Sequence, residues 1–86
     1  MPDALTQRTL EIVASHLDGP APDLAVTTTF QELDLDSFDV VNIVADLEQE
    51  YDVFVPNDDA LAITTIGDAV AELRKLIEQK QANGTT

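Results

Sequence analysis

Ser37 is the residue whose type and position could support covalent chemistry in this chain. It follows Leu35-Asp36 and precedes Phe38-Asp39, where a long loop meets the start of a predicted helix. Position alone favours an N-cap role, in which the serine oxygen accepts a hydrogen bond from an early helical amide. A functional role is also open, because a phosphodiester on an exposed hydroxyl here would lie against free amides and the positive end of the helix.

The acidic residues around Ser37 do not form a calcium loop. An EF-hand loop that starts at Asp34 needs an oxygen ligand at its fifth position, Gly at its sixth and Glu at its twelfth. The sequence supplies Phe38, Asp39 and Ala45 at these positions. We therefore expect no metal site.

Enzymatic chemistry has little support in the composition. The chain has no cysteine, which excludes a disulfide framework, a thiolate zinc site and a cysteine nucleophile. His16 is the one histidine and has no nucleophile partner in register, and three glycines leave no material for a phosphate-cradling loop. The sequence predicts a protein that is not an enzyme.

The elements that must position Ser37 are predicted to be helices. Apolar residues recur at helical spacing in residues 3–17, 37–51 and 65–81. Residues 18–20 are expected to stop the first of these helices, and Thr65 with Asp68 resembles a capping box at the start of the last. A short helical turn is expected near residues 57–62, where residues 56–59 offer a cap. We expect an all-α fold, a small antiparallel four-helix bundle of three long helices and one short one. A long first loop at residues 19–36 separates the first two helices.

Two further features complete the expected organisation. Phe30, Leu33 and Leu35 are candidates to pin the long loop to the core, since a loop of this length in a small domain is usually functional or held by side chains. Residues 1–81 are expected to form one domain, and residues 82–86 a flexible C-terminal tail.

The charge balance excludes other classes of partner. The 86 residues include 17 acidic and 4 basic side chains, a formal net charge of −13, and no Lys or Arg lies between Arg8 and Arg74. A nucleic-acid binder needs a basic footprint, so nucleic acid is not an expected partner. No secretory signal or membrane-spanning stretch is evident, and we expect a monomeric, cytoplasmic protein.

Four ordered segments resemble the acyl carrier protein family from Leu33 to Leu73. The family's Asp-Ser-Leu signature after a Leu-Gly pair is similar to Leu-Asp-Leu-Asp-Ser-Phe at residues 33–38. Residues 47–52, Val55-Pro56 and residues 63–70 look like the family's acidic helix end, its Ile-Pro pair and its Thr-Val-Gly-Asp segment.

The resemblance implies a function for Ser37. It implies that 4′-phosphopantetheine is attached there by a phosphopantetheinyl transferase, with magnesium at the phosphates of coenzyme A and Asp36 close to the metal. The thiol of that arm would carry acyl groups as thioesters in fatty-acid, polyketide or related specialised lipid biosynthesis. Further expected partners are acyl-loading, ketosynthase or acyltransferase enzymes with basic patches.

The chain departs from the family pattern at four positions. Asp34 stands where the family usually has Gly, and Asp is one of the few other residues that tolerate a positive φ. Phe38 replaces Leu, Asn42 stands where many members have an acid, and Phe54 where a polar residue is common. These departures suggest a specialised carrier with its own partners.

Two surfaces follow from the resemblance, each with an ordinary structural alternative. The acidic face is a solvated surface or a partner surface, with rim charges at Asp36, Asp39, Asp46 and Glu48 and an apolar centre at Phe38, Val41 and Ala45. The apolar stripe is first an ordinary core, and by resemblance it could also line an acyl pocket at Val40, Ile43, Val44, Leu47, Ile63 and Ile66.

Two other functions stay open from the sequence. One is a peptidyl or aminoacyl carrier of the same fold. The other is an unmodified acidic helical adaptor that binds a basic partner and uses Ser37 only as a cap. The modification state of Ser37 distinguishes the adaptor from the carriers.

Overall fold

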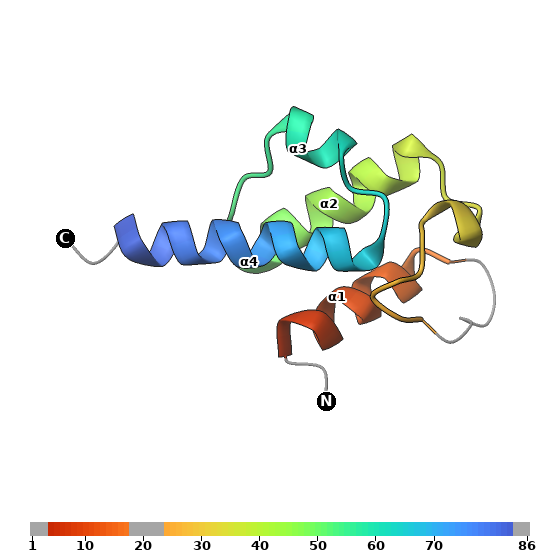
Figure 1. Cartoon of the computed structure of the whole chain (residues 1–86), viewed down its shortest axis with the longest axis horizontal. Helices are drawn as coiled ribbons and strands as arrows, with labels where there is room; N and C mark the ends of the chain where they lie inside the picture. Colours follow the sequence, from red (N-terminus) through yellow and green to blue (C-terminus); the bar gives the residue numbers. More distant parts are fainter. Residues whose placement is uncertain (1–3, 18–23, 84–86) are drawn as a thin grey trace.

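The computed structural model describes residues 4–17 and 24–83, which fold as helices joined by loops (Figure 1). The helices are α1 (Ala4–Ser15), α2 (Ser37–Tyr51), α3 (Asn57–Leu61) and α4 (Ile66–Asn83), with a short 3-10 turn, η1, at Gln31–Leu33. Within the described ranges there is no strand, only an isolated bridge between Thr29 and Thr65. The expected all-α fold of three long helices and one short helix is confirmed.

The long helices do not all alternate in direction. Figure 1 shows that α1 runs opposite to α2 and α4, as expected, whereas α2 and α4 run the same way. The reason is the connection of residues 52–65, which contains α3 and returns the chain to the end of the molecule where α2 began. The first residues of α2 and α4 therefore lie toward the same end.

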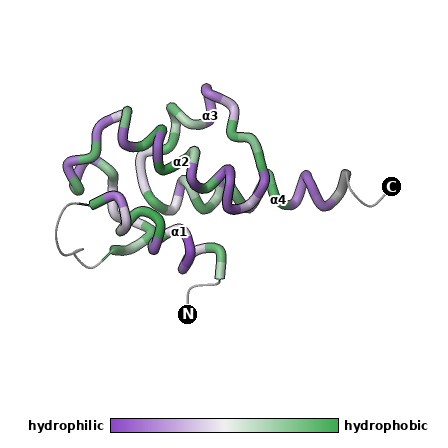
Figure 2. The backbone as a smooth tube through the Cα atoms, turned by 180° about the vertical axis from the view of Figure 1, so that it is seen from behind, coloured by the Kyte–Doolittle hydropathy of each residue, from purple (hydrophilic) through white to green (hydrophobic). Residues whose placement is uncertain are grey.

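The core forms where the apolar faces of the long helices meet. Along each helix in Figure 2, hydrophobic and hydrophilic segments alternate, as expected for helices with one buried face. The buried apolar residues are Ile12, Val13, Phe30, Ile43, Val44, Leu47, Val55, Ile63, Ile66, Ala69, Val70 and Leu73. Thr9 is also fully buried, although its hydropathy does not predict a core position. Its hydroxyl donates a hydrogen bond of 2.8 Å to the carbonyl of Leu5, so the buried hydroxyl has a partner.

The long first loop is pinned as expected. Phe30 is 3% exposed, and Leu33 and Leu35 are half-buried against the same core. Backbone hydrogen bonds add to this anchoring, since the amide of Phe30 donates to the carbonyl of Thr64 and the amide of Ile66 to that of Thr28. The predicted stop at residues 18–20 lies outside the described residues; α1 itself ends at Ser15, before the expected Leu17.

Three helix ends differ from or refine the expectations. The expected Thr65 and Asp68 capping box is confirmed, since each backbone amide donates to the other side chain at 3.0–3.1 Å. Hydrogen bonds from Thr64 and Thr65 lower the pKa of Asp68. The expected side-chain cap of α3 was wrong, because Pro56 is the N-cap and makes no such bond. Helix α4 reaches Asn83, past the expected boundary at 81, and residues 84–86 lie outside the described residues.

Gly67 allows the long loop to approach α4 closely, and replacing it with alanine is expected to destabilise the fold. Its amide donates to the Val26 carbonyl at 2.8 Å, and an added Cβ would lie 2.9 Å from that oxygen. In an unobstructed helix the change to Ala stabilises by about 0.5–1 kcal/mol. Here we expect the opposite sign, a loss of about 1–3 kcal/mol from steric overlap. Urea unfolding measures it, and a gain in stability would contradict the close approach.

Candidate functional site

The N-terminus of α2 is capped by Asp36 and not by Ser37. The Asp36 carboxylate accepts a hydrogen bond of 2.9 Å from the Asp39 amide, and the Asp39 carboxylate accepts one of 3.2 Å from the Asp36 amide. The predicted serine cap was therefore wrong by one residue. Asp is as good a cap as Ser, and Asp39 three residues later closes the capping box. Ser37 becomes the first residue of the helix and is exposed.

The chain approaches Ser37 through a turn that uses an unusual backbone conformation. Asp34 has φ 58 and ψ 30, in the left-handed region, as its place in the sequence led us to expect. Its amide donates to the carbonyl of Gln31, and the amide of Leu35 donates to the carbonyl of Phe30. Because Phe30 is buried, the turn ties the position of Ser37 to the core.

A groove of about 330 Å³ lies beside Ser37, between α2 and α3. Its walls are mainly apolar, and the two polar lining residues are Ser37 and Asn57. The complete lining is Ser37, Val40 and Val41 from α2 and Asn57, Ala60, Leu61 and Ile63 from α3 and the following loop. Ser37 therefore lies on the rim of an apolar groove.

The groove matches only part of the expected acyl pocket. Val40 and Ile63 line it. Among the other expected residues, Ile43, Val44, Leu47 and Ile66 are 0–6% exposed and belong to the closed core. The sequence did not identify three lining residues, Asn57, Ala60 and Leu61, because a five-residue helix is too short to show which face it turns inward.

The residues expected at a partner surface have unequal exposure. Phe38 is 72% exposed and Val41 55% exposed on α2, so they are available for an apolar contact. Ala45 is half-buried. The exposed apolar surface of α2 therefore lies at Phe38 and Val41, close to Ser37, and is smaller at Ala45.

All four expected rim charges have partners within the chain, and Asp36 and Asp39 share the capping box described above. Asp46 lies 2.6 Å from Nε2 of His16 on the segment after α1. Glu48 is half-buried, and its carboxylate accepts a 2.7 Å hydrogen bond from the Val55 amide. Glu48 thereby holds the loop that leads to α3. Reversing the charge of Asp39 or Glu48 would remove these hydrogen bonds, so neither substitution would test charge alone.

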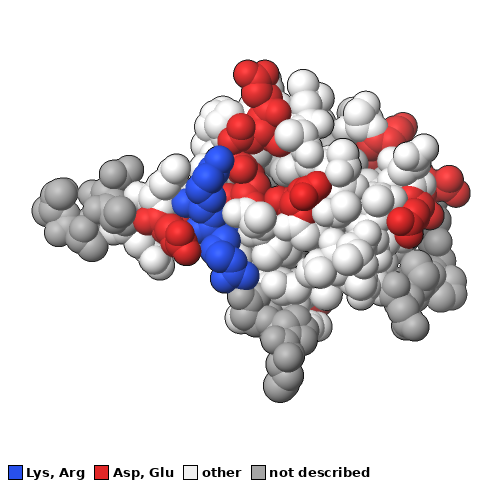
Figure 3. Space-filling model, in the orientation of Figure 1, with Lys and Arg blue, Asp and Glu red and all other residues white. Residues whose placement is uncertain are grey.

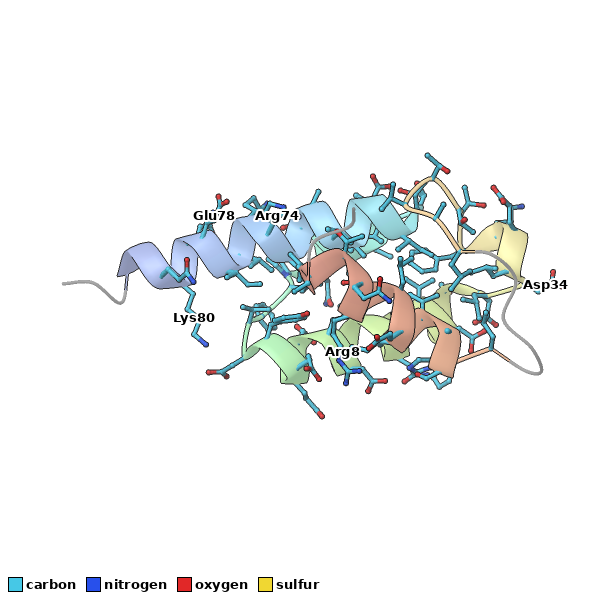
Figure 4. The ribbon with its side chains drawn as sticks, turned by 90° about the horizontal axis from the view of Figure 1, so that it is seen from below. Arg8, Asp34, Arg74, Glu78 and Lys80 are labelled. Carbon is cyan, nitrogen blue, oxygen red and sulfur yellow. The ribbon has the colours of Figure 1, made fainter. Side chains whose placement is uncertain are left out.

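Acidic side chains lie beside the basic ones. Lys80 and Arg74 on α4 lie far from Asp34 in Figure 4, with Glu78 next to Arg74, and Figure 3 shows the blue side chains in one stripe with red side chains on both sides of it. Lys80 lies 2.8 Å from Asp52, and Arg8 on α1 bridges Glu11 and Glu50. Among the residues that the structure describes, no three potential metal ligands come together.

Comparisons with known proteins place the chain in a family. The family profile described as "Phosphopantetheine attachment site" matches residues 7–73. A curated relative, the acyl carrier protein of Streptococcus thermophilus (strain CNRZ 1066), is 37% identical over 68 residues, which cover 79% of this chain and 89% of the relative. The chain belongs to the acyl carrier protein family. It is a carrier that other enzymes act on, and members of this family carry 4′-phosphopantetheine covalently.

Solved structures of acyl carrier proteins share the fold. The crystal structure of the acyl carrier protein from Thermotoga maritima has a TM-score of 0.77 at 20% identity, covering 92% of this chain and 98% of its own. The hexanoyl form of the actinorhodin polyketide synthase carrier from Streptomyces coelicolor has a TM-score of 0.69 at 23% identity, covering 92% of each chain. At these identities the likeness shows the fold alone.

The Ser37 end of the molecule fits a phosphopantetheine arm. The hydroxyl is exposed, does not cap the helix, and stands at the helix N-terminus, where amides and the helix dipole favour a phosphate. The adjoining apolar groove offers contact for a flexible chain attached there. In the described part of the chain, no helix is both long and apolar enough to cross a bilayer.

Proposed function

We propose that Ser37 is the attachment residue for 4′-phosphopantetheine and that the chain carries acyl intermediates in fatty-acid, polyketide or related lipid biosynthesis. The observation that carries this proposal is the placement of Ser37. Asp36 takes over the capping role, so the serine hydroxyl stays exposed at the helix N-terminus and on the rim of the groove.

The chain contributes a nucleophile and a site that receives the phosphate. In the loading reaction the Ser37 oxygen forms a bond to the phosphorus that carries the pantetheine arm, the pyrophosphate bond of coenzyme A breaks, adenosine 3′,5′-bisphosphate leaves, and the hydroxyl proton passes to a base of the transferase. The first amides of α2 then lie near the new phosphodiester and stabilise its charge. The arm supplies the thiol for thioesters, and Asp36, one residue earlier, is the candidate for contact with the transferase's magnesium.

The groove gives attached cargo an apolar surface within reach of Ser37. Val40 and Ile63 are the expected pocket residues that line it. Its volume of about 330 Å³ is at the low end of the range for small-molecule pockets, which suits part of an arm or a short acyl group. A peptidyl or aminoacyl cargo is the second candidate, because the groove contains a polar residue, Asn57, in addition to Ser37.

We also propose how the carrier meets its partners. Phosphopantetheinyl transferase and acyl-loading, ketosynthase or acyltransferase enzymes would contact Phe38 and Val41, with acidic residues around them attracting basic patches. The proposed carrier domain spans residues 1–81, which include the matched residues 7–73. Its proposed setting is the cytoplasm, where it works as a monomer.

Asp58 is a better residue than Asp39 or Glu48 for testing charge steering, because Asp39 and Glu48 accept hydrogen bonds within the chain. It is exposed, lies in the first turn of α3 next to the groove residue Asn57, and takes no part in a capping box. We expect Asp58→Lys to slow the transferase reaction several-fold at low salt and less at high salt, because screening weakens the attraction. The control Glu78→Lys makes the same charge change on exposed α4 surface and is expected to have a smaller effect. Equal rates for both variants and the parent would contradict steering at this end.

The proposed function is tested by intact mass. The unmodified chain is incubated with coenzyme A, magnesium and a broad-specificity phosphopantetheinyl transferase. We expect the mass to rise by one phosphopantetheine group. A folded, initially unmodified chain that gains no mass would contradict the carrier function and favour the acidic adaptor.

A further inference from the structure

Glu72 on α4 holds a buried carboxylate oxygen that accepts no hydrogen bond. Its side chain is 13% exposed, and the buried oxygen is Oε2. The other oxygen, Oε1, lies 3.2 Å from Nζ of Lys75. An ionised oxygen buried in this way costs free energy, whereas a protonated one becomes a donor and needs only an acceptor nearby.

Asp59 on α3 is the acceptor at hand, because Nζ of Lys75 lies 3.2 Å from Glu72 Oε1 and 3.5 Å from Asp59 Oδ2 and so places the two carboxyl groups side by side. The two carboxyl groups shift each other's pKa in opposite directions. Burial and the hydrogen bond with Asp59 raise the pKa of Glu72 above its ordinary 4.5, while the hydrogen bond from Glu72 lowers the pKa of Asp59 below its ordinary 3.8. These directions fit one proton held by Glu72 and donated to an ionised Asp59.

Lys75 completes this cluster. Its Nζ lies 3.5 Å from Asp59 Oδ2, and its hydrogen bond to Glu72 and the two carboxyl charges raise its pKa. Two other acidic residues on the same helices do not belong to this cluster. Asp68 of α4 is bound to Thr64 and Thr65, and Asp58 of α3 is exposed.

Helix α3 has few other contacts that hold it in place. It has five residues, none of them buried, and no side-chain cap. Its flanking residues Val55 and Ile63 are buried, whereas within the helix Ala60 is only partly buried against the core. Yet α3 supplies Asn57, Ala60 and Leu61 to the groove. An interaction that fixes Asp59 therefore also fixes the position of the α3 residues that line the groove.

We propose that Asp59, Glu72 and Lys75 form a proton-dependent latch that fastens α3 to α4, and that loss of the Glu72 proton to solvent loosens α3 and opens the groove beside Ser37. The latch stands on these contacts alone. Its role in exposing cargo rests on the proposed carrier function.

The pH dependence follows from the direction of each pKa shift. Glu72 has a raised pKa in the folded state, so its contribution to stability is full below its ordinary value and is lost as pH rises through the raised value. Asp59 has a lowered pKa, so its contribution is present above its ordinary value and lost as pH falls through the lowered one. The latch is strongest between the lowered pKa of Asp59 and the raised pKa of Glu72, and it weakens as pH rises through the latter.

NMR on the unmodified full chain tests the latch. The carboxyl carbon of Glu72 and the exchange protection of the Ala60, Ala62 and Ile63 amides, which bond within α3 and its ends, are followed from about pH 4 to about pH 8. We expect Glu72 to titrate above its ordinary pKa and the protection to fall several-fold with the same midpoint. Protection that does not change with the Glu72 titration would overturn the proposal.

Three variants sharpen this test. Glu72→Gln keeps a donor for Asp59 at every pH, so protection of α3 should stay flat. Glu78→Gln, a change of the same type at an exposed position of α4, should follow the parent. Should Glu72→Gln fail to fold, Asp59→Asn gives the answer, because loss of the negative charge of Asp59 should lower the midpoint of Glu72; an unchanged midpoint would overturn the latch.

A second experiment connects the latch to cargo. The parent and Glu72→Gln are loaded at Ser37 with a short acyl phosphopantetheine, and cleavage of the thioester by hydroxylamine is compared at about pH 5 and about pH 8. We expect equal rates at the lower pH and several-fold faster cleavage of the parent at the higher pH. Equal rates at both would refute groove opening. Failure to load would refute the proposed function and leave the NMR result on the latch standing.

Discussion

Ser37→Ala is expected to abolish the gain of one phosphopantetheine group completely. The hydroxyl oxygen is the nucleophile in the proposed attachment, and a methyl group cannot form the bond to phosphorus. The variant should otherwise resemble the parent. Since Asp36 and not Ser37 caps α2, we expect its free energy of unfolding to change by no more than about 0.5 kcal/mol, the range of surface substitutions.

The control for this prediction is the second of the two serines in the chain. Ser15 donates a hydrogen bond to the carbonyl of Ile12 at the end of α1, so Ser15→Ala should still gain the group. Intact mass after incubation with the transferase measures both variants. A mass gain by Ser37→Ala would move the attachment to another residue. A loss of stability near 1 kcal/mol would show that the serine hydroxyl does help to cap the helix.

Phe30→Ala is expected to remove a large part of the stability of the fold. Phe30 is 3% exposed and anchors the loop that leads to Ser37, and its amide also bonds to Thr64. Large-to-small changes of a buried Phe cost about 3–5 kcal/mol. A small domain has a free energy of unfolding of about 5–10 kcal/mol at most, so the variant should unfold at much lower urea concentration.

Phe54→Ala provides a matched comparison. Phe54 is 74% exposed in the loop after α2, so truncating it leaves no cavity. We expect its unfolding midpoint to stay close to that of the parent, with a change of about 0.5 kcal/mol or less. Similar losses from both variants would mean that Phe30 is not the residue that ties the loop to the core.

Periodicity was sufficient to predict the long helices. The stripe of apolar residues that begins after Ser37 predicted α2 with the bounds Ser37–Tyr51 that the structure has, and the capping box at Thr65 and Asp68 located the start of α4. The cap of α2 was harder to predict, because Asp36 and Ser37 are both good caps and only the geometry of Asp39 distinguishes them.

Contacts between distant segments could not be predicted from local patterns. The sequence alone predicts that Glu48 and Asp46 are solvent-facing acids on α2. The structure shows instead that Glu48 accepts a hydrogen bond from the Val55 amide and that Asp46 contacts His16. The groove depends on how α3 docks, which a five-residue helix does not reveal by its spacing. The pairing of Asp59 with Glu72 likewise joins two helices that are separate in sequence.

The uneven distribution of basic residues has a consequence for the geometry of collisions. No Lys or Arg lies in residues 9–73, which include Asp34, Asp36 and Asp39 close to Ser37, whereas Lys80 and Arg74 lie far from Asp34 (Figure 4). This unevenness gives the protein a dipole moment. The field of a basic enzyme surface exerts a torque on such a molecule within about a Debye length, roughly 8–10 Å, before any contact forms. The end that bears Ser37 should therefore face the enzyme when the two proteins collide. A larger fraction of collisions then occurs in orientations in which the enzyme can reach the serine.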